Sequence, residues 1–256
     1  MNADNHQQLM INATDVVKNF ATGRAVDHIN LQVARGDTFA FLGPNGAGKT
    51  TTVKMLTTLL RPDAGKIMVD NIDIAANPTE ARRRFGVVFQ ECTLDPKMTV
   101  HENLWAHGAF YDVPKIIRKQ RIEEVLETFD VADRAKHFVG TLSGGLKRRI
   151  EIARAILHKP ALIFLDEPTL GLDPQSRRMM WEQIGILQKV SNTTIFLTTH
   201  YLDEVEKFAQ KVAVIRKGKI LMQGTPQSIM AATRHDSLEE AFVHLTRDDN
   251  QQESES

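Results

Sequence analysis

Short apolar runs and stretches of helical periodicity alternate along most of this chain of 256 residues. Three apolar runs near the amino terminus are bounded by turn signals and predict β-strands over residues 9–20, 25–33 and 38–42. Further short apolar runs predict strands over residues 67–69, 86–89, 161–165, 194–197 and 212–215. Apolar positions near helical spacing predict helices over residues 51–60, 116–129, 146–157, 175–189 and 201–209. This alternation of strand and helix predicts an α/β protein with a mainly parallel sheet.

A helical block interrupts this α/β core between Thr99 and His158. Thr99 and Glu102 have the spacing of a capping box, which predicts that a helix starts there. Ser237 stands in a similar place before a last predicted helix, and the polar residues 248–256 predict a disordered tail. The sequence contains no internal repeat.

A glycine-rich loop between the strand at 38–42 and the following helix carries the strongest chemical signal. Its sequence is Gly43-Pro44-Asn45-Gly46-Ala47-Gly48-Lys49-Thr50, which fits the P-loop pattern. The glycines let backbone N–H groups turn toward phosphate oxygens, and the helix aims the positive end of its dipole at them. Lys49 adds a point charge, and the Thr50 hydroxyl can reach Mg²⁺. The loop therefore predicts a nucleotide site.

Two carboxylates follow the apolar strand at 161–165. Ligands bind at the carboxyl ends of parallel strands, so Asp166 is placed to hold Mg²⁺, directly or through water. Glu167 is one residue further along and can polarise a water for in-line attack on the γ-phosphate. An Asp-Glu pair after a strand often has no function, but a P-loop in the same chain favours the catalytic interpretation.

Leu142-Ser143-Gly144-Gly145 precedes the helix predicted over 146–157. Backbone N–H groups at the start of that helix, together with the Ser143 hydroxyl, could form an anion site. The alternative is an ordinary serine cap followed by flexible glycines. An apolar stripe on this helix includes Ile150 and Ala153, whereas Lys147, Arg148 and Arg149 are expected to face water.

Composition narrows the choice of partners. The 32 basic and 32 acidic side chains balance, which disfavours a protein that acts by binding nucleic acid. The single cysteine, Cys92, cannot form an internal disulfide, and no motif surrounds it to mark a nucleophile. Residues 1–8 lack the apolar segment of an export signal, and the longest apolar runs are too short to span a bilayer. We expect membrane crossing, if the protein needs it, to come from another polypeptide.

The motifs together resemble the nucleotide-binding subunit of an ATP-binding cassette (ABC) transporter, from about Leu9 to Leu245. Beside the P-loop, residues 142–146 resemble the LSGGQ signature, and residues 162–167 resemble the Walker B strand with its catalytic glutamate. Gln90 matches the Q-loop, residues 170–173 match the D-loop, and His200 matches the switch histidine. All of them follow the P-loop in the order typical of the family.

The resemblance implies an α/β fold with a P-loop NTPase (RecA-like) core, an N-terminal antiparallel β subdomain and an inserted α-helical subdomain. The expected ATPase domain covers residues 9–245, with its core at about 9–90 and 159–225 and its helical subdomain at about 91–158. A C-terminal helical extension is expected over 226–247, followed by the tail at 248–256.

The resemblance also implies a mechanism and further site residues. Two subunits would sandwich two ATP molecules as a homodimer, each ATP lying between one P-loop and the Ser143-Gly144-Gly145 of the other chain. Phe20 would stack on adenine, although it could equally be a core residue, and Thr51 would join the nucleotide-binding residues. Gln90 would contact Mg²⁺ or the attacking water. His200 would orient that water, its alternative role being a capped histidine before the next helix.

The same resemblance implies a separate transmembrane permease as partner and a location on the inner, cytoplasmic face of the cell membrane. Two departures affect the dimer contacts: Leu146 replaces the final Gln of the signature, and the D-loop lacks its usual Ser-Ala opening. The segments 167–174 and 237–242 resemble the multidrug and ABC-2-type exporter branch. The main alternative is a soluble ABC ATPase acting on nucleic acid or ribosomes, which usually carries two cassettes or a long coiled-coil insertion. A P-loop kinase or GTPase would leave the signature unexplained.

Overall fold

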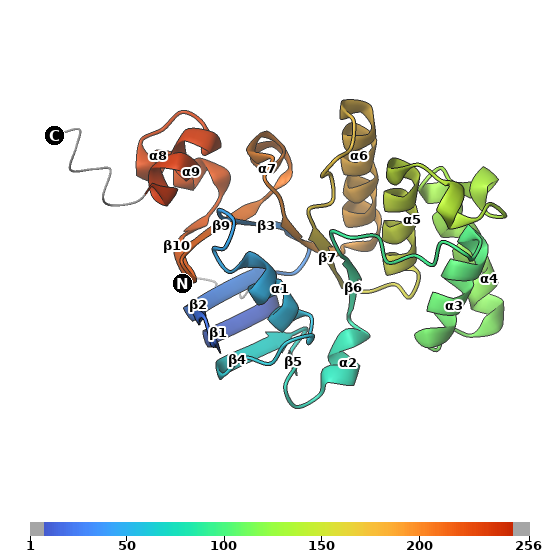
Figure 1. Ribbon diagram of the computed structural model, residues 1–256, viewed down its shortest axis with the longest axis horizontal. Helices are drawn as coiled ribbons and strands as arrows, with labels where there is room; N and C mark the ends of the chain where they lie inside the picture. Colours follow the sequence, from blue (N-terminus) through green and yellow to red (C-terminus); the bar gives the residue numbers. More distant parts are fainter. Residues whose placement is uncertain (1–7, 248–256) are drawn as a thin grey trace, which may run out of the picture. The chain divides into compact units, whose positions relative to one another are not determined.

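The computed structural model describes residues 8–247 (Figure 1), so the predictions for residues 1–7 and for the tail at 248–256 lie outside the described residues. The described chain forms two compact units. Unit 1 runs to Pro78 and resumes at Phe196, and unit 2 covers Thr79–Ile195. None of the described helices is long and apolar enough to cross a membrane.

Unit 1 contains an antiparallel sheet with the strand order β2-β1-β4-β5. Its strands are β1 (Leu9–Phe20), β2 (Gly23–Ala34), β4 (Ala64–Val69) and β5 (Ile72–Asp73). In β2 the buried residues Ile29, Leu31 and Val33 alternate with exposed polar ones, as expected for a sheet with one face on the core. The β1–β2 hairpin ends at Phe20, so its tip carries an exposed aromatic ring.

A second sheet in unit 1 carries the P-loop. The fully buried β3 (Thr38–Leu42) runs parallel to β9 (Lys211–Arg216), which pairs antiparallel with β10 (Lys219–Gly224). The other neighbour of β3 is β8 (Thr194–Thr198), whose Phe196 ring stacks on Phe39 with centroids 5.5 Å apart. The helices of unit 1 are α1 (Lys49–Leu56), α7 (Leu202–Phe208), α8 (Pro226–Thr233) and α9 (Leu238–Thr246).

Unit 2 combines two parallel strands with most of the long helices. Strands β6 (Phe85–Val88) and β7 (Leu162–Asp166) pair in parallel, and the start of β8 lies beside β7. Phe85 and Phe164 pack edge to face, with centroids 5.4 Å apart. The helices are α2 (Pro78–Arg82), α3 (Val100–Phe110), α4 (Lys115–Thr128), α5 (Gly144–Ile156) and α6 (Pro174–Ser191), with short 3₁₀ turns η1 (Ala132–Arg134) and η2 (Val139–Thr141).

The expected fold class is confirmed, since the chain has an α/β core, an antiparallel sheet at its amino terminus and a group of inserted helices. Both predicted helix starts are also confirmed. Thr99 and Glu102 form the reciprocal capping box, and the Ser237 hydroxyl accepts from Glu240 N at 3.2 Å. The division of the ATPase domain at residues 91 and 158 stays a prediction.

Some boundaries and elements differ from the prediction. Helix α1 begins two residues earlier than expected and ends at Leu56, because Thr58 adopts a left-handed backbone with φ 64°. The strand β10 was not predicted, whereas α8 lies within the helical extension expected over 226–247. In β10 exposed and half-buried residues alternate at the sheet edge, so the strand shows little apolar enrichment.

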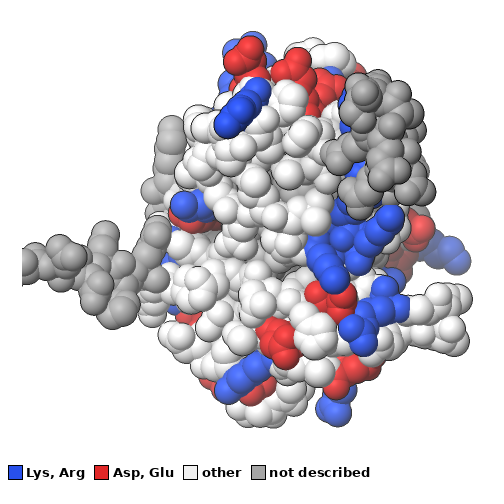
Figure 2. Space-filling view, turned by 90° about the vertical axis from the view of Figure 1, so that its left-hand side faces the viewer, with Lys and Arg blue, Asp and Glu red and all other residues white. Residues whose placement is uncertain are grey.

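Charged side chains of both signs are interspersed on the face drawn in Figure 2. This mixture agrees with the balanced total of 32 basic and 32 acidic residues. That face therefore does not present the single-signed field that favours a polyanion such as nucleic acid.

Candidate functional site

The P-loop joins β3 to α1 and leaves the first turn of that helix open for an anion. Gly48 is the residue before α1, its φ is 107°, and no side chain caps the helix. The first turn of α1 also contains no acidic residue. The amide groups at the start of a helix lack partners within the helix, so this end is suited to phosphate oxygens.

Steric limits explain why glycines occupy the two ends of the loop. A Cβ at Gly43 would lie 2.4 Å from the Ile215 carbonyl oxygen, and one at Gly48 would lie 2.5 Å from the Ala25 carbonyl oxygen. Ala47 accepts a hydrogen bond from Gly218 N at 2.9 Å. The loop is therefore seated against β2 and the turn between β9 and β10.

The P-loop lysine closes its own loop. Lys49 Nζ donates to the Gly43 carbonyl oxygen at 2.6 Å and to the Pro44 carbonyl oxygen at 3.2 Å, and the residue is 9% exposed. The next residue, Thr50, is exposed, so its hydroxyl is accessible to an ion. The charge of Lys49 thus lies directly beside the loop that would surround the phosphates.

Unit 1 holds two more of the predicted site residues. Phe20 is 46% exposed at the end of β1, and Lys18 Nζ lies 5.8 Å from its ring centroid. An exposed ring is available for stacking on a base, and this exposure does not support the alternative that Phe20 is a core residue. His200 is exposed between β8 and α7.

Unit 2 holds the two carboxylates. Asp166 ends β7 and is partly exposed, whereas Glu167 is 5% exposed and adopts a left-handed backbone with φ 48°. A residue with a side chain is uncommon in this conformation and persists only when its surroundings hold it. Leu170 N donates to the Glu167 carbonyl oxygen at 3.2 Å, which closes the turn after the strand.

A pocket of about 220 Å³ in unit 2 brings three of the motifs together. Gln90 after β6, Gly144 at the start of α5 and the D-loop residues 170–172 all line it. Gly144 has open space where a Cβ would stand, and Gly145 lies near Ser176. Ser143 caps α5 by accepting from Leu146 N at 3.4 Å. This contact is the one that the simple capping alternative expects, so the anion-binding role of Ser143 stays a prediction.

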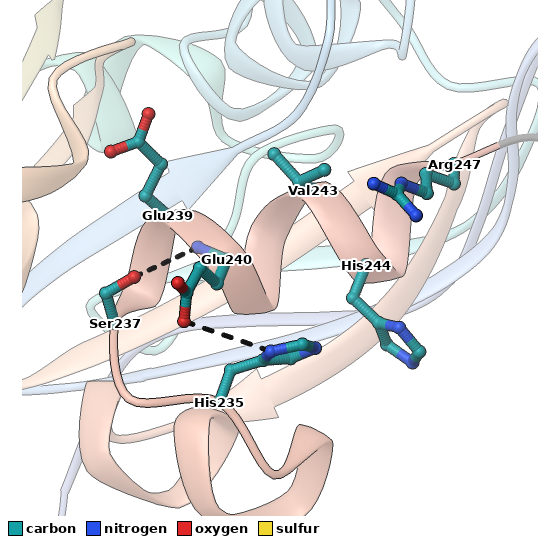
Figure 3. A pocket seen from close by; sticks show the side chains of 7 residues that line it. All are labelled: His235, Ser237, Glu239, Glu240, Val243, His244 and Arg247. Atoms are coloured by element: carbon teal, nitrogen blue, oxygen red, sulfur yellow. Dashed lines mark hydrogen bonds and ion pairs between the residues drawn. The ribbon is translucent and has the colours of Figure 1, made fainter.

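Another pocket lies away from these motifs, in unit 1. It has a volume of about 580 Å³ and is lined by residues of α9 and of the segment before it, where His235 faces Glu240 at 4.0 Å (Figure 3). None of the predicted site residues lines it. Another pocket, of about 290 Å³, is formed on α3 by Met98, Trp105 and Ala106 with two neighbours.

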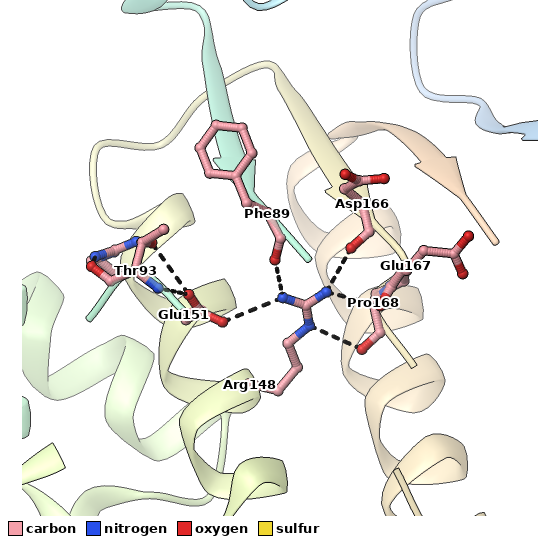
Figure 4. A network of polar contacts seen from close by, with 8 residues as sticks. Phe89, Thr93, Arg148, Glu151, Asp166, Glu167 and Pro168 are labelled. Atoms are coloured by element: carbon pink, nitrogen blue, oxygen red, sulfur yellow. Dashed lines mark hydrogen bonds and ion pairs between the residues drawn. The ribbon is translucent and has the colours of Figure 1, made fainter. Parts of the chain in front are cut away.

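One prediction about α5 is wrong. Arg148 was expected to face water with Lys147 and Arg149, but it is 7% exposed. Its guanidinium donates to backbone carbonyls near both Gln90 and Glu167 and pairs with Glu151 (Figure 4). The sequence did contain a signal, because Glu151 lies between the apolar Ile150 and Ile152, and a buried carboxylate requires a cationic partner.

Metal binding by protein groups alone is not supported in the described part of the chain. No group of three His, Cys, Asp or Glu side chains there could hold a metal ion. A cation at the predicted site would therefore also need ligands from the nucleotide, as Mg²⁺ usually does.

A buried stack of aromatic and histidine rings lies between α3 and the end of α5. Tyr111 and His158 stack with centroids 3.9 Å apart, and His107 lies 4.7 Å from Tyr111. Burial lowers the pKa of His107 to about 3, aided by the positive charge of Arg154. Burial also lowers the pKa of His158 to about 4. Both imidazoles are therefore neutral near pH 7.

Comparison with known proteins agrees with this geometry. The sequence model of the ABC transporter family matches residues 26–170. A daunorubicin resistance ATP-binding protein of Streptomyces coeruleorubidus is 38% identical over 222 residues, which are 87% of this chain and 70% of that protein. A Nod factor export ATP-binding protein of Burkholderia thailandensis is 40% identical over 220 residues, 86% of this chain and 72% of that protein.

A solved structure has a similar fold. A dimeric ATP-binding cassette in a post-hydrolysis state, bound to ADP and Pi, superposes with a TM-score of 0.76 and 27% identity. The match covers 84% of this chain and 98% of that one.

The buried histidines predict a specific dependence of stability on pH. The unfolded chain binds a proton at His107 below roughly pH 6.5, whereas the folded chain resists it down to about pH 3. The stability that neutral His107 contributes is therefore complete above pH 6.5 and is lost as the pH falls toward 3. We expect His107→Phe to flatten the slope of unfolding free energy between roughly pH 5.5 and 4.5 by about 1.4 kcal/mol per pH unit.

Urea unfolding at a series of pH values measures this slope. The matched control is His137→Phe, because His137 is exposed, and it should keep the native slope. An unchanged slope in His107→Phe would show that His107 is protonated in the folded chain.

Proposed function

This chain belongs to the ABC transporter family, and on that premise we propose that it hydrolyses ATP to power export through a separate membrane permease. The observation that carries the proposal is the geometry of the P-loop. The helix after it begins without a side-chain cap and without an acidic residue in its first turn, and the Lys49 ammonium group lies against the loop. Export is supported by the named roles of the relatives, which are drug resistance and Nod factor export. These relatives do not fix the cargo of this chain.

We propose that Thr50, Gln90 and Asp166 supply oxygen ligands for Mg²⁺. The donor set fits, because a hydroxyl, an amide oxygen and a carboxylate are hard ligands, and each residue is at least partly accessible. When bound, the ion would neutralise charge that develops on the phosphate oxygens. The residues of the chain then have the tasks of holding the nucleotide and activating water.

The carboxylate of Glu167 is the proposed general base. Its turn fixes the residue directly after β7, and its burial keeps competing water away from it. His200 is proposed to orient the attacking water and the γ-phosphate, and Gln90 to contact the ion or the water. A base of this kind contributes by accepting the proton of the water as the bond to phosphorus forms.

The complete site is proposed to need two copies of the chain. The solved relative described above is a dimer that is bound to ADP and Pi. We propose that the P-loop of one copy and Ser143, Gly144 and Gly145 of the other hold the same ATP. The open space at Gly144 and the exposure of Ser143 are consistent with an approaching ligand.

A surface on α3 is the proposed permease contact. Trp105 and Ala106 line its apolar pocket, and the Phe110 side chain is 83% exposed at the end of the same helix. Exposed apolar surface on a protein is typical of interaction sites. Docking there would hold the protein at the inner face of the membrane.

The nucleic-acid alternative has less support. The charges on the face in Figure 2 are mixed, and the relatives are named for resistance and export. A protein that binds a polyanion usually shows a basic excess, which this chain lacks.

We expect Glu167→Gln to lower ATP turnover by about 10²–10⁴-fold while ATP still binds, because the P-loop is unchanged. Lys49→Ala is the contrasting variant and should weaken nucleotide binding as well. Equilibrium binding of ATP and release of phosphate are measured on both proteins. Near-native turnover by Glu167→Gln would exclude it as the base.

A second expectation separates the two halves of the composite site. Ser143→Arg should spare ATP binding by the monomer but block hydrolysis, since Ser143 would serve the nucleotide of the other copy. When Ser143→Arg chains are mixed with Lys49→Ala chains, the heterodimer pairs the intact P-loop of the first chain with the intact signature of the second. Mixing should therefore restore at most one working site. If the Ser143→Arg monomer cannot bind ATP, the signature serves only its own chain.

The docking surface is tested with a matched pair of exposed alanines. We expect Ala106→Arg to weaken co-purification with a candidate permease while basal ATP hydrolysis persists, because the charge enters the apolar pocket. Ala132→Arg places the same charge on the exposed turn η1 and should retain the complex. Equal recovery of permease with both variants would place the contact elsewhere.

A further inference from the structure

A buried ion pair on α5 connects the backbone on either side of Gln90 to the backbone around Glu167 (Figure 4). The pair is Arg148 and Glu151, whose side chains are 8% and 3% exposed. All of its contacts lie within unit 2. The pair takes no part in the hydrolysis mechanism proposed above, so its function is open.

The Arg148 guanidinium meets the strand end at several carbonyl oxygens. Nη2 donates to Asp166 O at 2.7 Å and to Glu167 O at 2.9 Å, and Nε donates to Pro168 O at 3.0 Å. In Figure 4 the backbone carbonyl oxygens of Asp166 and Glu167 point toward the guanidinium, whereas their carboxylates point away from it. Arg148 thus holds the backbone of this turn through its carbonyl oxygens and not through the two carboxylates.

The same pair holds the segment around Gln90 on both sides. Arg148 Nη1 also donates to the carbonyl oxygen of Phe89, the residue before Gln90. Glu151 Oε1 accepts from Thr93 N at 2.7 Å and from Thr93 Oγ1 at 3.2 Å. Glu151 Oε2 lies 3.3 Å from Arg148 Nη1, which closes the network.

The chemistry of this contact set is specific to arginine. A planar guanidinium presents five N–H donors in a fixed fork, so one side chain can satisfy carbonyls from separate segments. A lysine at the same place has one rotatable point charge and cannot reach them together. Because the pair is buried, removing either partner alone would leave an uncompensated charge.

Both residues lie on the helix that begins at the signature. Ser143 caps α5, and Arg148 and Glu151 follow on its second and third turns. A rigid helix carries its side chains with it, so a displacement of its start by bound nucleotide also displaces the carbonyls that Arg148 holds. The signature would then act on Gln90 and Glu167 together.

We propose that Arg148 and Glu151 are positioning residues for ATP hydrolysis. They fix the positions of Gln90 and Glu167 relative to the helix that begins at the signature. The proposal rests on the function proposed above, in which Glu167 is the base. In this proposal the pair acts through the backbone of the two catalytic segments, which its hydrogen bonds hold. Misplacement of a reacting group by about 1 Å can cost roughly 10²-fold in rate.

The first test compares two arginines of α5. Arg148→Lys keeps the charge but loses the fork, and we expect kcat to fall about 10²-fold with KM for ATP unchanged. Arg149→Lys is the control, because Arg149 donates only to the Phe129 and Asp130 carbonyls and pairs with Asp130. It should keep the native kcat. Thermal unfolding of both proteins confirms that they are folded at the assay temperature.

The second test asks whether Arg148 acts through Glu167. Added to Glu167→Gln, Arg148→Lys should lower turnover by much less than it does in the native protein, because one of the two groups that it positions is already missing. A purely structural arginine would instead multiply the two losses. Multiplied losses, or a folded Arg148→Lys protein with native kcat, would overturn the proposal.

A variant of Glu151 covers the case in which Arg148→Lys does not fold. Glu151→Gln preserves the side-chain shape and the acceptor for Thr93 but removes the charge that orients Arg148. We expect its kcat to fall with KM unchanged, and native kcat would overturn the proposal. If Glu167→Gln alone keeps native turnover, the proposed base fails. If Glu167→Gln loses turnover and the α5 variants do not, only this inference fails.

Discussion

The contact between the P-loop and its supports is the constraint on which the other features depend. Carbonyl oxygens of Ala25 and Ile215 stand so close to Gly48 and Gly43 that no side chain fits at either glycine. This seat holds the loop from which α1 begins, and no side chain caps the first turn of the helix. The strands that provide the seat, β2 and β9, come from two different sheets and from both parts of unit 1, so the shape of the loop depends on contacts far apart in the sequence.

The sequence could predict the features that depend on neighbouring residues. The P-loop, the capping box at Thr99 and the strand before Asp166 depend on short spacings, and each is present in the structure. The ABC transporter family was also predictable, because its motifs occur in a fixed order. Phe20 was left open between stacking and core, and its exposure had to come from the hairpin geometry.

Features that depend on contacts between distant residues could not be predicted from the sequence alone. Lys147, Arg148 and Arg149 are all basic, and the middle one is buried because it meets Glu151 and backbone carbonyls more than fifteen residues away. The left-handed backbone of Glu167 is a similar case, since nothing in the residue type favours it. The burial of His107 and His158 is another such case, because it results from the packing of α3 against the end of α5.

Because Arg148 binds backbone oxygens, most of its partners can change their side chains without affecting it. Phe89 and Pro168 each contribute a backbone carbonyl, which every residue possesses. Correlated substitution during evolution would therefore report only the link between Arg148 and Glu151. The connection from the signature helix to the base would stay invisible to covariation, although it passes through the most buried arginine among those that the structure describes.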